Sequence, residues 1–330
     1  MKNISGFAVF VIILCGALGG VQAVFAQEKS KNTYAFSFSY QFGFLYGQAE
    51  ELVYPADTKA EYLSQLLWDI KPVLYNGLLL DFSPASPAEK SGVFSNISFK
   101  YGIPGNSGKM EDRDWVSLQN TALTHFSSHD NITREIFLID ACGGYSLALA
   151  RFMVIKPFIN VSYMRYRFSG TGGYASYAKE TSPGSGIYAP IDWSTPHFFE
   201  GKVINYTQEW ITAAPGFFMG FYFLKLLFTE FSFQISPLII CVDLDEHLKT
   251  NVQYRDYMRG GLLIEPAFRL SCAFNRWVEL SASCSWRFIK GSKGEIYARN
   301  PIGSGTYTQQ GIAGAGLSII DTGFLLKVRL

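Results

Sequence analysis

Apolar and polar residues alternate strictly between Val278 and Phe288. Every even position there is apolar and every odd position is polar. Only an extended strand places successive side chains on opposite faces in this way. The preceding segment, 264–274, alternates similarly, and Asn275-Arg276 supplies a tight connection between the two. The pattern therefore predicts an antiparallel hairpin with one apolar face.

Strand-like runs recur along most of the chain, many of them longer than the strands usual in soluble sheets. Further runs lie near residues 34–54, 61–82, 94–103, 134–148, 155–170, 209–223, 231–237 and 306–330. Very short connections, such as 149–153, alternate with long ones rich in glycine, serine and asparagine, such as 104–133 and 170–206. This layout is typical of an outer-membrane barrel.

The predicted fold is all-β: an antiparallel transmembrane β-barrel of about ten strands, with long extracellular loops and short periplasmic turns. A closed sheet is favoured because every backbone polar group inside lipid needs a partner. A secreted soluble barrel or sandwich is the alternative. The aromatic-rich apolar faces of the long strands favour the membrane barrel.

The start of the chain has the three-part pattern of a secretory signal peptide. A basic residue, Lys2, precedes an apolar stretch over residues 7–18, and Ala26 offers a small residue at a cleavage point. We therefore expect an exported protein in two parts, a signal peptide over residues 1–26 and a barrel over residues 27–330.

Composition excludes several classes of protein. Hydrophobic residues make up 48% of the 330 residues and charged residues 17%, so the chain is not intrinsically disordered. A formal net charge of +1 provides no broad basic face for nucleic acid. The cysteines that follow the expected signal peptide show no C-x-x-C spacing, and no nearby histidine completes a zinc-binding spacing, which argues against a zinc site. They are Cys142, Cys241, Cys272 and Cys284.

Two clusters of ionisable residues stand out from the scattered charges. In the first cluster, Asp112 and Asp114 lie two positions apart. In the second, Asp243, Asp245 and His247 follow one another at intervals of two positions. In extended strands each set shares one face. The residues alone leave three interpretations open: a metal site, for which no fixed ligand spacing is present, a solvated rim of charges, and a site that activates water with His247 as the base.

Four segments carry a resemblance to a known family. Residues 43–54 and 63–68 resemble its first two strands, 110–115 resembles its M-x-D-x-D-W segment, and 243–247 its D-x-D-E-H segment. The sequence thereby resembles the omptin family, outer-membrane endopeptidases of Gram-negative bacteria built as ten-stranded barrels. The last two segments are specific because they hold the family's catalytic residues in the same chain order.

By this resemblance, Asp112 and Asp114 form a catalytic aspartate couple, and Asp245 with His247 forms a dyad. The implied enzyme is an aspartic-type endopeptidase. A water held between Asp112 and His247 attacks the scissile carbonyl, without a serine or cysteine nucleophile. No metal and no cofactor is expected.

The resemblance also implies a substrate class. Glu51 and Asp243 occupy the positions of acidic side chains that receive a basic residue of the substrate. Carboxylates form charge-assisted hydrogen bonds with arginine. Cleavage is therefore expected beside arginine or lysine, within a basic pair.

Family members bind lipopolysaccharide on the barrel exterior, and three residues match that pattern: Tyr163, Arg167 and Arg255. The chain departs from the pattern at Arg165, where an acidic residue is expected, and at Glu209, where an arginine is expected. The resemblance makes lipopolysaccharide a candidate requirement for activity.

We therefore predict a monomeric outer-membrane endopeptidase of a Gram-negative bacterium, with its active site facing outside. Its partners are polypeptides with basic residues, outer-membrane lipid and lipopolysaccharide, and not nucleic acid. The alternative is a catalytically silent barrel with the same fold that serves as an adhesin or a structural protein.

Overall fold

The computed structural model describes residues 34–55, 60–223, 226–299 and 306–330. They contain fourteen strands: β1 (Tyr34–Val53), β2 (Ser64–Pro84), β3 (Gly92–Gly102), β4 (Gly105–Asp114), β5 (His125–Ala150), β6 (Met153–Tyr177), β7 (His197–Phe198), β8 (Lys202–Phe223), β9 (Leu227–Ser236), β10 (Ile239–His247), β11 (Val252–Arg259), β12 (Leu262–Ala273), β13 (Val278–Arg299) and β14 (Thr306–Arg329). The described part of the chain contains no helix long and apolar enough to span a membrane. All fourteen strands belong to one sheet, and their pairings are antiparallel.

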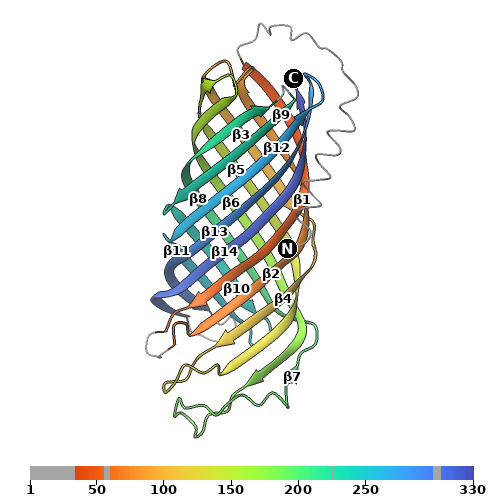
Figure 1. Cartoon of the computed structure of the whole chain (residues 1–330). Helices are drawn as coiled ribbons and strands as arrows, with labels where there is room; N and C mark the ends of the chain where they lie inside the picture. Colours follow the sequence, from red (N-terminus) through yellow and green to blue (C-terminus); the bar gives the residue numbers. More distant parts are fainter. Residues whose placement is uncertain (1–33, 56–59, 224–225, 300–305) are drawn as a thin grey trace.

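Three pairs of strands are the two halves of one longer strand. β3 and β4 both lie between β2 and β5, β9 and β10 both pair with β8, and β11 and β12 both pair with β13. The halves are separated by breaks at Pro104, Pro237 and the pair Gly260-Gly261, whose positive φ angles of 70° and 96° suit glycine. With these halves joined and the two-residue β7 set aside, ten strands of the described chain form the ring. The pairing of β1 with β14 closes it (Figure 1), which confirms the predicted barrel.

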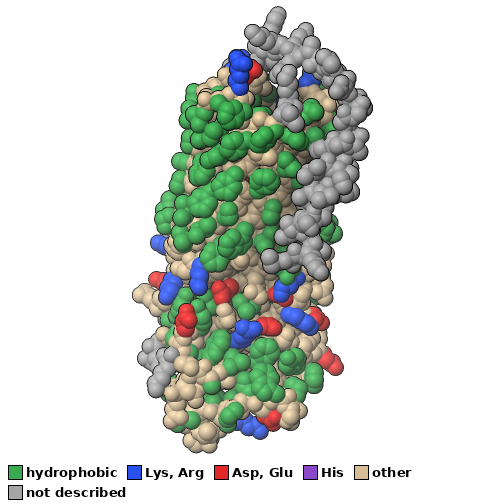
Figure 2. Space-filling view, viewed as in Figure 1, with side chains coloured by type: hydrophobic (Ala, Val, Ile, Leu, Met, Phe, Trp, Pro, Cys, Tyr) green, Lys and Arg blue, Asp and Glu red, His purple; other side chains and the backbone are tan. Residues whose placement is uncertain are grey.

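The barrel is apolar outside and polar inside over much of its length. On β1, Phe36 and Tyr46 are 62% and 50% exposed, whereas Ser37 and Ser39 between them are buried. Figure 2 shows the resulting apolar belt, with a band of charged side chains on one side of it. A surface of this kind is stable in lipid and not in water. The belt is therefore the membrane-spanning part.

The two ends of the barrel differ in the length of their connections. We call the end where β1 meets β2 the rim and the opposite end the base. Connections at the base are short, such as 85–91, 151–152 and 274–277, whereas the rim carries 115–124 and the long segment 178–201 around β7. The predicted alternation of short turns and long loops is confirmed. Figure 1 shows the rim at the bottom of the view, where β4 and β7 project.

The expectation of a loop over residues 104–133 was wrong. β4 and the first part of β5 occupy most of that segment and pair with each other. These strands extend beyond the apolar belt, so neither of their faces has to be apolar. The contrast between alternate positions is lost there, and with it the sequence signal for a strand.

Charged side chains inside the barrel are paired. Arg287 bonds to Glu265 at 2.6 Å and to Asp140 at 2.8 Å, and Lys156 bonds to Glu230 at 2.9 Å. A cavity of about 170 Å³ remains beside the Arg287 pairs. A barrel of this strand number has an interior narrow enough for side chains to fill.

Candidate active site

The two ionisable clusters lie at the rim on opposite walls of the barrel. Asp112 and Asp114 lie at the end of β4, and residues 243–247 form the end of β10. β5, β6 and β8 lie between β4 and β10 in the ring, which places these two strands nearly opposite one another. Ile211 and Ile240, exposed in the apolar belt, lie on the base side of the clusters. The clusters are therefore outside the membrane-spanning part.

His247 is held by a buried aspartate on its own strand. Its Nε2 lies 2.7 Å from Oδ2 of Asp245, which is only 2% exposed. Burial lowers the pKa of His247, but the charge and hydrogen bond of Asp245, together with the charges of Asp112 and Asp114, raise it to about 9. Asp112 and Asp114 therefore act on this imidazole electrostatically from the opposite wall.

The Asp112–Asp114 couple retains protons more strongly than free carboxylates do. Burial raises the pKa of both groups, and the neighbouring charge of Asp114 raises that of Asp112 further. His247 has the opposite effect on both. Ser64 of β2 donates to Oδ1 of Asp112 at 3.5 Å. The couple therefore keeps a proton to higher pH than an exposed pair of aspartates would.

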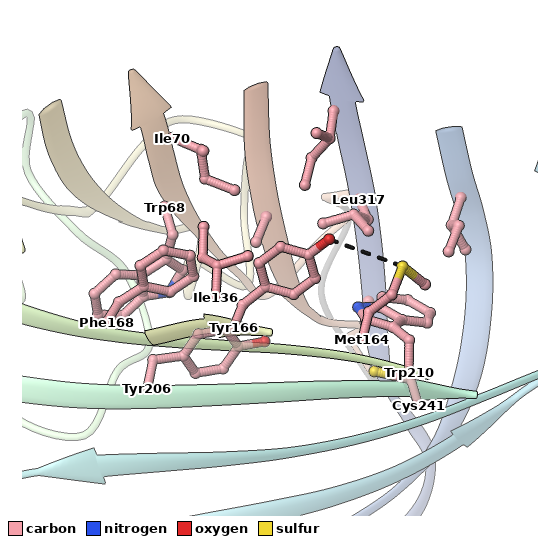
Figure 3. Close-up of a cluster of buried hydrophobic side chains, with 14 of the residues drawn as sticks. Trp68, Ile70, Ile136, Met164, Tyr166, Phe168, Tyr206, Trp210, Cys241 and Leu317 are labelled. Carbon is pink, nitrogen blue, oxygen red and sulfur yellow. Dashed lines mark hydrogen bonds between the residues drawn. The ribbon is translucent and has the colours of Figure 1, made fainter. Parts of the chain in front are cut away.

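Stacked aromatic rings connect the walls beneath these clusters (Figure 3). Trp68 of β2 stacks on Tyr206 of β8 with a centroid distance of 5.2 Å, and on Phe168 of β6 at 5.6 Å. Nε2 of Gln208 on β8 donates to the main-chain oxygen of Glu50 on β1 at 3.0 Å. The opposite walls of the barrel are therefore in direct contact below the candidate site.

Three buried carboxylates, which we call the acid cluster, lie beside the dyad: Glu51, Asp243 and Asp256. Their exposed fractions are 3%, 2% and 0%. Tyr206 donates to Oδ2 of Asp243 at 3.0 Å, but four other oxygens of the cluster have no partner among the described residues. Burial and the neighbouring acidic charges raise the pKa of each carboxyl.

This arrangement can move protons and can receive a cation. The imidazole of His247 and the couple opposite supply a base and an acid within one site. The acid cluster supplies carboxylate oxygens that accept no hydrogen bond from the described residues. Among the described residues, no group of three or more histidine, cysteine, aspartate or glutamate side chains has the arrangement of a metal site.

Residues 32–324 of the chain match the model of the omptin family. The chain belongs to the omptin family. It is 26% identical over 265 residues to the plasminogen activator of Yersinia pestis. The aligned region covers 79% of this chain and 77% of that protein. Its fold matches that of the outer membrane protease OmpT from Escherichia coli with a TM-score of 0.79, at 17% identity over 92% of this chain and 100% of that chain.

Membership of the omptin family makes this chain a protease of the Gram-negative outer membrane, with its rim facing the outside of the cell. The predicted polypeptide substrates agree with this class. The signal peptide expected over residues 1–26 lies outside the described residues.

The three residues matched to lipopolysaccharide binding in omptins lie on the outer surface but do not form one cluster. Tyr163 and Arg167 of β6 contact Glu209 at 3.2 Å and Glu135 at 3.4 Å, respectively. Arg255 is exposed on β11, and β8 and β10 separate it from β6.

Arg165 and Glu209, the two departures from the omptin pattern, are partners. Arg165 Nε lies 3.2 Å from Oε1 of Glu209. In this chain the two positions therefore form an ion pair.

Sequence analysis did not identify Asp256, Tyr206 or Gln208. A signal for Asp256 was present, because it directly follows Arg255. Neighbouring residues of a strand point to opposite faces, so an outward Arg255 requires an inward Asp256. Tyr206 and Gln208 had a weaker signal, since the start of β8 falls partly inside the segment expected to be a loop.

Proposed function

We propose that this omptin-family protease is an aspartic-type endopeptidase that cleaves beside basic residues. The observation that carries the proposal is the facing arrangement of two proton-exchanging pairs. Asp245 holds His247 at 2.7 Å on one wall. Asp112 and Asp114 on the other wall are close enough to raise the pKa of that imidazole.

In the proposed reaction, water attacks the scissile carbonyl while His247 removes its proton. Because Nε2 of His247 is held by Asp245, Nδ1 is the nitrogen left to accept that proton. Asp112 holds the same water from the opposite wall. The imidazolium that forms is stabilised by Asp245 and then protonates the leaving amine. No covalent intermediate forms.

Asp112 and His247 act as a coupled pair in this reaction. The charge of Asp112 raises the pKa of His247 and the charge of His247 lowers that of Asp112, so the protons belong to the pair and not to one residue. Asp114 contributes by raising the pKa of Asp112. The Asp112–His247 pair can therefore lose one proton and act as a base without placing two negative charges in the buried site.

Substrate selection is assigned to Glu51 and Asp243. Oε2 of Glu51 and Oδ1 of Asp243 are buried without a donor. A basic side chain would supply charge-assisted hydrogen bonds to both. We therefore expect cleavage next to arginine or lysine, within a basic pair.

Peptide cleavage by refolded protein tests this function. Matched peptides carrying Arg-Arg, Arg-Ala or Ala-Ala at one position are incubated with wild type and His247→Ala, and the products are identified by mass spectrometry. We expect much faster cleavage beside arginine than at Ala-Ala, and a loss of at least ~10²-fold in His247→Ala. Equal, negligible cleavage by both proteins would favour the silent adhesin instead.

A requirement for lipopolysaccharide stays a prediction, as does the monomeric state. Glu135 and Glu209 already pair with the basic residues of β6, which weakens the attraction of that surface for phosphate groups. The rate of peptide cleavage with and without added lipopolysaccharide, at constant detergent, tests the requirement. An unchanged rate would remove lipopolysaccharide as a cofactor.

A further inference from the structure

Asp256 is a buried carboxylate that the reaction above does not use. It lies opposite Asp243 in the register of β10 and β11. Its side chain is 0% exposed, and neither of its carboxylate oxygens has a hydrogen-bond partner among the described residues. An ionisable group buried without a partner is strongly disfavoured. Such a group keeps its proton while the site is empty and can ionise when a cation binds beside it.

Among the described residues, the groups packed around Asp256 include none that is basic. The strands packed around it present Glu51 (β1), Tyr206 (β8), Cys241, Asp243 and Asp245 (β10), and the apolar Ile296 (β13). Tyr206 donates to Asp243 and Asp245 is held by His247. The missing partner of the acid cluster is therefore a cation.

We propose that Asp256 determines specificity by completing a three-carboxylate receptor, with Glu51 and Asp243, for the guanidinium of a substrate arginine. The inference rests on the proposed function and extends it. Oε2 of Glu51, Oδ1 of Asp243 and both oxygens of Asp256 are the acceptors without donors. A guanidinium offers five N–H donors in a planar fork, whereas an ammonium offers three. The receptor therefore prefers arginine to lysine.

Arginine binding to this receptor releases protons. Burial, followed by the charge of Asp245, raises the pKa of Asp256 to about 7, and burial raises the pKa of Glu51 and Asp243 as well. A bound guanidinium favours the ionised carboxylates. Binding is therefore weaker at pH values where the empty cluster is protonated. KM for an arginine peptide therefore falls as pH rises through about 7, the pKa of Asp256.

The test compares full-length refolded wild type with Asp256→Asn. Each protein is given two peptides that are identical except at one position, which is either arginine or citrulline, its uncharged isostere. KM and kcat are measured between about pH 5.5 and 8, a range that brackets the pKa of Asp256. For the arginine peptide, we expect Asp256→Asn to raise KM by ~10–100-fold at the upper end of this range and to flatten its pH dependence. KM for citrulline and kcat for both peptides should change little.

Two further variants make the test specific. Glu295→Gln removes a carboxylate from β13 opposite Tyr257, the neighbour of Asp256, and should leave KM unchanged. Asp256→Glu retains the charge and should retain the pH dependence of KM. In wild type, KM for arginine but not for citrulline should vary with pH, and the loss of this dependence in Asp256→Asn assigns it to Asp256.

The outcomes separate this inference from the proposed function. An unchanged KM in Asp256→Asn, while wild type still cleaves arginine peptides, overturns the receptor and leaves the protease mechanism standing. An equal loss of kcat on both peptides, with a lower melting temperature, also overturns it, because that result shows a structural role. Failure of wild type to cut beside arginine at all would overturn the proposed function itself.

Discussion

At the residue scale, the chemistry of the rim depends on which carboxylates have partners. Asp245 is paired with His247 at 2.7 Å and tunes that imidazole. Asp243 and Asp256 lie in the same neighbourhood but retain oxygens without donors. Oδ1 of Asp245 also has no donor among the described residues, so the contact of Asp245 with His247 is what distinguishes it from Asp243 and Asp256.

The pH dependence of catalysis tests the assignment of Asp245. His247 must be neutral to accept a proton, and its pKa is raised to about 9. In wild type, kcat/KM for an arginine peptide should therefore still rise from pH 7 toward about 9. Asp245→Asn removes the main charge that raises this pKa, so the rise should move to lower pH while the maximum falls by ~10²-fold or more. An unmoved profile would show that another group titrates.

At the element scale, strands from opposite walls meet through the aromatic stack. Trp68 of β2 is fully buried between Tyr206 and Phe168, and Tyr206 in turn bonds to Asp243. The stack therefore couples the packing of β2, β6 and β8 to the position of the acid cluster.

Removal of the Trp68 ring should affect both stability and binding. Trp68→Ala leaves a cavity and is expected to lower the free energy of unfolding by ~3–5 kcal/mol. It should also raise KM for arginine peptides, because Tyr206 loses its stacking partner. Trp193→Ala, at an exposed rim position, is the matched control. Denaturant titration and steady-state kinetics measure the two effects, and wild-type values in Trp68→Ala would contradict the coupling.

The sequence predicted the elements best where they cross the membrane. Lipid on one side and water or paired charge on the other produce the strict alternation of residues 278–288, and that hairpin is observed. β4 lies beyond the lipid, so its pattern was lost and only the spacing of Asp112 and Asp114 marked it. Asp256 had a signal in its alternation with Arg255, but its proximity to Glu51 joins strands far apart in sequence, which alternation cannot bring together.

At the scale of the whole molecule, the barrel separates a lipid-embedded part from a projecting rim. Short base connections and paired internal charges belong to the first part, and both ionisable clusters belong to the second. Because omptins present the rim to the outside, a polypeptide can reach the site without entering the barrel.

Lysine labelling on intact cells tests this orientation. Lys179 and Lys249 are exposed at the rim, whereas Lys90 is exposed in the base turn 85–91. A membrane-impermeant amine reagent should modify the first two and not Lys90, as read by mass spectrometry. Lys90 should react once the cells are lysed. Labelling of Lys90 alone on intact cells would reverse the orientation.

A double-mutant cycle on Asp112 and His247 tests the central claim most directly. The kcat/KM values of wild type, Asp112→Asn, His247→Ala and the double variant are measured on one arginine peptide. If the two side chains act on the same water, each single variant loses at least ~10²-fold and the double variant loses little more than either. Losses that multiply, or a single variant with near wild-type activity, would contradict the account.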